Sequence, residues 1–264
     1  MRLSTAIALG SLATVGLGVY LLVGPVLKNL GSQTLIAYVL TVIFFIPVIL
    51  VLAERAAVIR GRGGLFNLAR SGDIVWLSYW TGWLLLSGYF CLIALFAWGA
   101  GQALNTAILD FAELDVDYRL LAALAVVLVV LLRLIRSESA WNFKSGIIYA
   151  SILVSFLLTL RLWVIPVRSI PPSSFLPTQD SIRAVPFLAV GMWGLSFVLD
   201  YRDEMRRPRR RMLAALSLPV LLSGFIGLIT TAILLQYPGV VASTDQPFFA
   251  LAAEIGPVAD GLLL

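Results

Sequence analysis

The stretch VGLGVYLLVGP, residues 15–25, lies near the end of an uncharged run that extends from residue 3 to residue 27. A second glycine motif, GMWG at residues 191–194, interrupts another uncharged run, residues 184–199. Glycine weakens a helix interior by about 1 kcal/mol relative to alanine, and proline removes a backbone hydrogen-bond donor. Both runs therefore predict helices with a break inside them, and Gly24-Pro25 predicts a stop in the first one.

The composition around these motifs is that of an integral membrane protein. Of the 264 residues, 60% are hydrophobic and only 12% are charged, whereas a soluble domain has roughly a quarter of its residues charged. A bilayer-crossing helix needs about 20 apolar residues, and seven uncharged runs meet or approach that length. They cover residues 3–27, 29–53, 74–109, 120–132, 145–160, 184–199 and 212–244. The fourth requires Tyr118, Arg119 and Arg133 at its rims, and the sixth requires Arg183 or Asp200 near an interface.

The basic residues are distributed unevenly between the two sides of a seven-helix arrangement. Fourteen of the 19 lie on the side of the N-terminus, which the positive-inside rule makes cytoplasmic. If residues 74–109 formed two helices, 9 basic residues would lie on one side of the membrane and 10 on the other, and the charge difference between the sides would disappear. We therefore predict one long tilted helix. An aromatic belt is expected at its cytoplasmic end, formed by Trp76, Tyr79, Trp80 and Trp83. The expected location is a plasma membrane of the bacterial inner-membrane type.

The residues present do not support an enzyme, a metal protein or a nucleic-acid-binding protein. The chain has no histidine, and its one cysteine, Cys91, forms no intrachain disulfide. No nucleophile with a neighbouring base lies within an apolar run, so we expect no enzyme, and no metal or other cofactor. The arginine-rich run 202–211 is interpreted as a topology anchor or an anionic-lipid site. Because the basic residues lie in short loops, we expect the lipid bilayer and no nucleic acid as a partner.

The positions of the two glycine motifs suggest a transporter. They lie in the first and sixth of the seven predicted helices, which enter the membrane from opposite sides, as the broken helices of an inverted-repeat transporter do. Backbone groups freed inside a membrane must line a cavity or bind something. The partial charges at half-helix ends suit a carboxylate and a cation, so a zwitterionic amino acid or another small substrate would fit. Taken singly, each motif is also compatible with close helix packing.

Three motifs together resemble the amino acid–polyamine–organocation (APC) superfamily of permeases. Residues 15–24 are similar to that family's helix-one signature. Ala53-Glu54-Arg55, followed by Gly63-Gly64-Leu65-Phe66, resembles its helix-two end and first cytoplasmic loop, where a short interfacial helix is expected. Gly194, Asp203-Glu204 and Pro208 repeat the spacing of its helix-six glycine, paired acidic residues and proline.

The resemblance implies an all-α polytopic membrane protein with the LeuT-like, five-plus-five inverted-repeat fold and an incomplete second repeat. The first repeat would be residues 1–167, the external linker 168–183, and the partial second repeat 184–264. The implied function is secondary active transport of amino acids or related amines, by alternating access around helices one and six. The implied substrate-binding residues are Val15, Gly16, Leu17, Gly18, Val19, Val190, Gly191, Met192, Trp193 and Gly194. Val190 aligns with the family's aromatic lid, and Phe187 and Trp193 are the nearby aromatic residues.

Two questions stay open from the sequence. The coupling cation is unknown, because the helix-five region near Tyr149 lacks the lysine that some family members carry, and a sodium site would need the eighth helix. We expect a fragment of a longer reading frame. The alternative is a truncated, non-transporting permease-like membrane protein that acts as a scaffold or partner.

Overall fold

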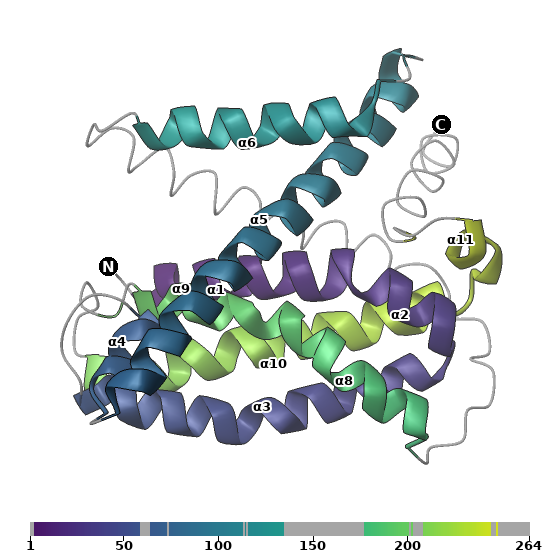
Figure 1. The fold of residues 1–264 in the computed structure, drawn as a ribbon. Helices are drawn as coiled ribbons and strands as arrows, with labels where there is room; N and C mark the ends of the chain where they lie inside the picture. Colours follow the sequence, from purple (N-terminus) through teal and green to yellow (C-terminus); the bar gives the residue numbers. More distant parts are fainter. Residues whose placement is uncertain are drawn as a thin grey trace. The chain divides into compact units, whose positions relative to one another are not determined.

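A computed structural model describes residues 3–58, 64–72, 74–112, 114, 116–134, 177–200, 202, 208–243 and 247. Every secondary-structure element in these ranges is helical (Figure 1). The chain forms two compact units: the first contains residues 1–73 and 148–252, and the second contains residues 74–147 and 253–264. Five described helices are long and apolar enough to cross a membrane, four in the first unit and one in the second. The fold is therefore the predicted all-α polytopic one.

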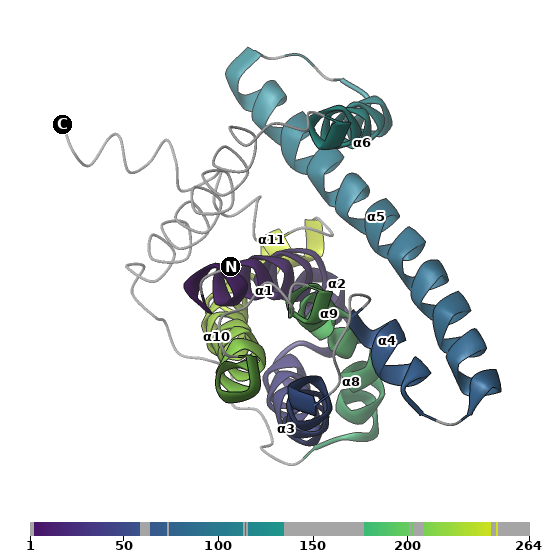
Figure 2. The same ribbon diagram turned by 90° about the vertical axis from the view of Figure 1, so that its left-hand side faces the viewer.

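The first unit is a bundle of long helices, several of which are divided into segments. Its elements are α1 (Leu3–Val15), η1 (Gly16–Leu21), α2 (Val23–Leu30), α3 (Gln33–Val58), α4 (Gly64–Arg70), α8 (Gln179–Gly191), η2 (Met192–Gly194), α9 (Leu195–Asp200), α10 (Pro208–Leu234) and α11 (Pro238–Ser243). α10 packs against both α1 and α3, α3 packs against α8, and α1 packs against η2 and α9. Figure 2 shows these helices close to end-on. The best-buried apolar side chains, such as Leu17, Tyr38 and Leu216, lie between them.

The second unit contains α5 (Val75–Ala112) and α6 (Tyr118–Leu134), which pack against each other. α5 is one uninterrupted helix of 38 residues, as predicted for residues 74–109. A methyl group on Gly101 would lie 2.9 Å from the Cβ of Ala122, so the glycine permits the close approach of α6. The predicted belt residues form a chain of edge-to-face ring contacts at the start of α5 and are exposed.

Helix boundaries follow the sequence prediction with two differences. α8 begins at Gln179, so Asp180 and Arg183 lie in its first turns, and α8, η2 and α9 together form a span of membrane length, Gln179–Leu199. The stop predicted at Gly24-Pro25 is wrong, because α2 continues through both residues to Leu30. Proline is tolerated there because it lies in the first turn of α2, where backbone N–H groups need no helical acceptor.

The expected short helix after helix two is present as α4, and it begins at Gly64 with a φ of 49°, a left-handed conformation that suits glycine. The fifth apolar run, residues 145–160, lies outside the described residues. So do Tyr149, the acidic pair Asp203-Glu204, most of the predicted linker and the segment after residue 247.

Candidate functional site

The first predicted break is a change of helical register rather than an open segment. Residues 16–21 form a π-helix, and the Leu22 N–H donates to the carbonyl of Leu17, five residues earlier, at 3.2 Å. Single π-helical turns within α-helices are frequent at functional sites. The segment is buried from Leu17 to Leu21, in the interior of the first unit.

The second predicted break is tighter than an α-helix. α8 ends at Gly191, residues 192–194 form a 3₁₀ turn, and α9 begins at Leu195. The Met192 N–H donates to the carbonyl of Ala189, three residues earlier. Met192 is fully buried and Trp193 is half-buried. Short 3₁₀ stretches inside a helix often mark a hinge.

The two breaks touch each other through a pair of glycines. A methyl group on Gly18 would lie 3.4 Å from the Cα of Gly191 and 3.4 Å from the hydroxyl of Tyr38. A methyl group on Gly191 would overlap the Cα of Gly18 and lie 3.1 Å from its nitrogen. The backbones of helix one and helix six are therefore in direct contact, and no amino acid fits between these two glycines while they touch.

Gly194 contacts a different part of helix one. A methyl group there would lie 2.7 Å from the backbone nitrogen of Thr14 and 2.8 Å from the Cβ of Ala13. This is close helix packing, and the Thr14 side chain anchors the same region. Its hydroxyl donates to the Gly10 carbonyl at 2.9 Å and lies 3.3 Å from the Pro219 carbonyl of α10, while the Ser223 hydroxyl donates to the Thr14 carbonyl at 3.3 Å.

The structure thus places the ten predicted site residues in two neighbouring groups. Val15, Leu17, Gly18, Val19, Gly191, Met192 and Gly194 are buried, Gly16 and Trp193 are half-buried, and Val190 is exposed. Gly18 and Gly191 meet, whereas Gly194 meets Ala13 and Thr14 rather than the π-helical segment. Val190, the position aligned with the aromatic lid, is 41% exposed.

Within the described part of the chain, the buried side chains around the breaks are mostly apolar and carry no charge. Among the described residues, Arg202 is the only charged one that is buried, and its guanidinium Nε–H donates to the Ala56 carbonyl in the last turn of α3. The indole nitrogen of Trp193 and the hydroxyl of Ser196 are buried, and neither has a hydrogen-bond partner among the residues that the structure describes. Buried polar groups normally have partners, so these two are available to a ligand. No described cluster of carboxylate or thiol side chains could hold a metal ion.

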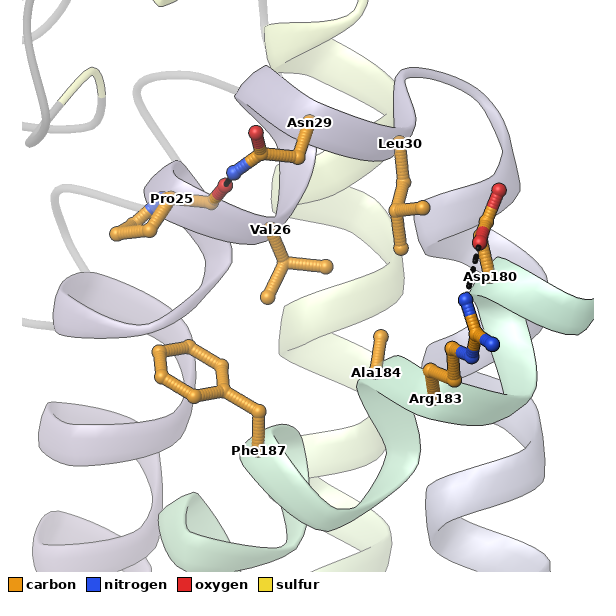
Figure 3. Close-up of a pocket in the computed structure, with 8 residues that line it drawn as sticks. All are labelled: Pro25, Val26, Asn29, Leu30, Asp180, Arg183, Ala184 and Phe187. Carbon is orange, nitrogen blue, oxygen red and sulfur yellow. Dashed lines mark hydrogen bonds and ion pairs between the residues drawn. The ribbon is translucent and has the colours of Figure 1, made fainter.

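Sequence reasoning missed an open pocket in the first unit, lined partly by exposed side chains. It has a volume of about 530 Å³ and lies between α2 and α8 (Figure 3). Its lining residues are Pro25, Val26, Asn29, Leu30, Asp180, Arg183, Ala184 and Phe187. Phe187 lies one helical turn before Gly191, at the opposite end of the cavity from the Asp180–Arg183 ion pair. The signal in the sequence was the pair Asp180 and Arg183, three residues apart at the start of a helix. Because helices were predicted from uncharged runs, the sixth one was expected to begin only at residue 184.

The described chain is all-helical, several of its helices are long enough to cross a membrane, and two of these are interrupted where they touch. These features define a polytopic membrane protein. The chain belongs to the amino acid permease family, whose model matches residues 2–255. This confirms the APC-type resemblance over nearly the whole chain and indicates a transporter. Neither the curated proteins nor the solved structures contain a match to the chain.

Proposed function

We propose that this chain forms the substrate-binding part of a secondary active transporter for amino acids or related amines. Transport would proceed by alternating access around the π-helical segment of helix one and the 3₁₀ turn of helix six. The observation that carries the proposal is the contact between Gly18 and Gly191, which joins the two irregular segments of a chain in the amino acid permease family.

The contacts in the first unit support an inverted repeat. If helices one and two correspond to helices six and seven, a pseudo-two-fold axis exchanges the α1–α10 contact with the contact between α8 and α3. The same operation exchanges the contacts of α1 with η2 and α9 for the contacts of α8 with η1 and α2, and it maps the contact of α3 with α10 onto itself. All of these contacts are present. Inverted-repeat transporters bind substrate at the interface between such repeats.

The contact between the glycines supports alternating access in particular. Because it leaves no room for a substrate, the backbone groups of residues 16–22 and 190–194 become available only when the two helices separate. A protein with two such states responds to a ligand that prefers the open one. The described conformation is then the closed one.

The uncharged surroundings favour a small substrate that carries both charges. With no charged side chain buried beside the breaks in the described residues, the substrate's charges would be met by helix ends, each equivalent to about half an elementary charge. A carboxylate suits a helix N-terminus and an ammonium suits carbonyl groups at a C-terminus. The Trp193 N–H offers an additional donor.

The test is uptake by proteoliposomes that contain the full-length protein. Radiolabelled amino acids and polyamines would be supplied one at a time, with a proton gradient, with a sodium gradient, and with unlabelled substrate inside to detect exchange. We expect saturable uptake of at least one amino acid or amine, absent from empty liposomes. Folded protein that moves none of them under any of the three conditions would contradict the proposal and favour a scaffold role.

A further inference from the structure

We propose that Tyr38 of α3 is a positioning residue for the separation of helices one and six. In the closed conformation its hydroxyl has no hydrogen-bond partner among the described residues. When the helices separate, the hydroxyl donates to a backbone carbonyl of helix one. The proposal rests on the alternating access proposed above, and it gives helix two a part in that movement.

The side chain of Tyr38 is held beside the glycine contact. It is fully buried, and its ring fills the space beside Gly227 of α10, where a methyl group would overlap both the ring and the hydroxyl. A methyl group on Gly18 would lie 3.4 Å from the Tyr38 hydroxyl and 3.4 Å from the Cα of Gly191. Tyr38 and Gly191 therefore border the same point of helix one from two different helices.

The hydroxyl of Tyr38 is a buried donor without an acceptor in the part of the bundle that the structure describes. Ser223 of α10 lies nearby, but its own hydroxyl donates to the Thr14 carbonyl at 3.3 Å. A polar group that is buried without a partner raises the free energy of the conformation that contains it. The closed conformation therefore carries a cost at Tyr38 that another arrangement of helix one can remove.

Helix one contains backbone carbonyls that its own N–H groups cannot satisfy. The Leu22 N–H donates to the Leu17 carbonyl, and the Val26 N–H donates to the Leu22 carbonyl. Between these two bonds lie the four carbonyls of residues 18–21, and only residues 23–25 could supply donors to them. One of those three residues is a proline, which has no N–H. When each N–H serves one carbonyl, two donors remain for four acceptors, so at least two carbonyls lack a helical donor.

Tyr38 borders the segment that contains these carbonyls, because its hydroxyl meets Gly18. Once Gly191 moves away, helix one can turn at its π-helical segment. A hydrogen bond from the Tyr38 hydroxyl to one of the carbonyls of residues 18–21 then satisfies the donor and the acceptor together. The bond stabilises the separated state relative to the closed one. Tyr38 therefore shifts the equilibrium between the two states without touching the substrate.

The test is Tyr38→Phe in the full-length protein, with Thr34→Val as the matched control. Thr34 lies one turn before Tyr38 on α3, and its hydroxyl is likewise buried without a described partner. The atoms nearest to a methyl group on Gly18 belong to Tyr38 and Gly191, not to Thr34. Both substitutions remove a hydroxyl and nearly preserve the shape of the side chain. Thermal unfolding measures stability, and hydrogen exchange of residues 16–22 in lipid nanodiscs measures the separation.

We expect Tyr38→Phe to melt at or above the wild-type temperature, because it removes an unpartnered polar group. Exchange of residues 16–22 should slow by about tenfold, because the separated state loses its hydrogen bond. Thr34→Val should likewise not lower the melting temperature, but residues 16–22 should exchange at the wild-type rate.

Three results would overturn the proposal. A lower melting temperature of Tyr38→Phe would show that the hydroxyl already has a partner in the closed conformation, either Ser223 or an internal water. Unchanged or faster exchange in Tyr38→Phe, or equal slowing in Thr34→Val, would show that Tyr38 does not favour the separated state. Failure of the proposed function is distinguishable, because the wild type would then show no uptake in liposomes, whatever the exchange rates of the variants.

Discussion

The contact between Gly18 and Gly191 can be tested with two alanine substitutions that should have unequal effects. A methyl group on Gly191 overlaps backbone atoms of Gly18, whereas a methyl group on Gly18 meets Gly191 at 3.4 Å, an ordinary contact distance. Gly191→Ala therefore requires helices one and six to separate, and Gly18→Ala does not. Both substitutions replace glycine by alanine within the same contact, so each is the matched control of the other.

The expected magnitude follows from the overlap. Inserting a methyl group into a packed interior costs about 1–3 kcal/mol, and backbone atoms of Gly18 cannot turn aside as a flexible side chain would. If the separated state accommodates the methyl group, that cost shifts the equilibrium toward it by roughly 5- to 150-fold. For Gly18→Ala we expect a shift of no more than about threefold, because the higher helix propensity of alanine offsets a mild contact.

Hydrogen exchange of the full-length protein in lipid nanodiscs measures this opening directly. Peptides that cover residues 16–22 and 190–195 should exchange faster in Gly191→Ala, and at the wild-type rate in Gly18→Ala. Peptides from α10 should be unchanged in both, which establishes that the bundle stays folded. Equal exchange in both variants, or faster exchange throughout the bundle, would refute the idea that this contact is the one that opens.

Three further substitutions test the packing described above. Thr14→Val removes the hydroxyl bonded to the Gly10 carbonyl and close to the Pro219 carbonyl, and should lower the free energy of unfolding by about 1 kcal/mol; a melting temperature equal to that of the wild type would contradict this. Arg202→Gln removes a buried charged donor from the Ala56 carbonyl, at a cost of about 1.5–3 kcal/mol, and should speed hydrogen exchange in the last turn of α3 only. Gly101→Ala should lower the melting temperature, because the methyl group meets the start of α6 and overpacking costs about 1–3 kcal/mol; unchanged melting would show that the two helices tolerate a wider spacing.

The helices of the bundle could be predicted from the sequence because the bilayer imposes a simple rule. An uncharged run of sufficient length must form a helix, since unpaired backbone groups are too costly in lipid. The single long α5 followed from the distribution of arginine and lysine, a signal that does not depend on local propensity. The positions of both breaks followed from glycine, although the type of helical turn at each did not.

What the sequence did not predict depends on contacts between distant segments or on position within a turn. Pro25 was expected to end a helix, but its effect depends on where the helix restarts, and α2 restarts at Val23. Asp180 was assigned to the linker 168–183 and Arg183 to its boundary with helix six, although charged residues in an exposed first turn cost little. The cavity they line requires α2 and α8 to be neighbours, and no local pattern encodes that neighbour relation.

The packing of α10 against both α1 and α3 has a consequence for how the protein is made. The ribosome completes α1 and α3 long before it reaches residue 208, so the contacts of both helices with α10, including the hydrogen bond from Ser223 to the Thr14 carbonyl, cannot form during that interval. Contacts this distant in sequence form late. The early helices must therefore wait at the insertion machinery, or pair transiently with other segments, until α10 enters the membrane and closes the bundle.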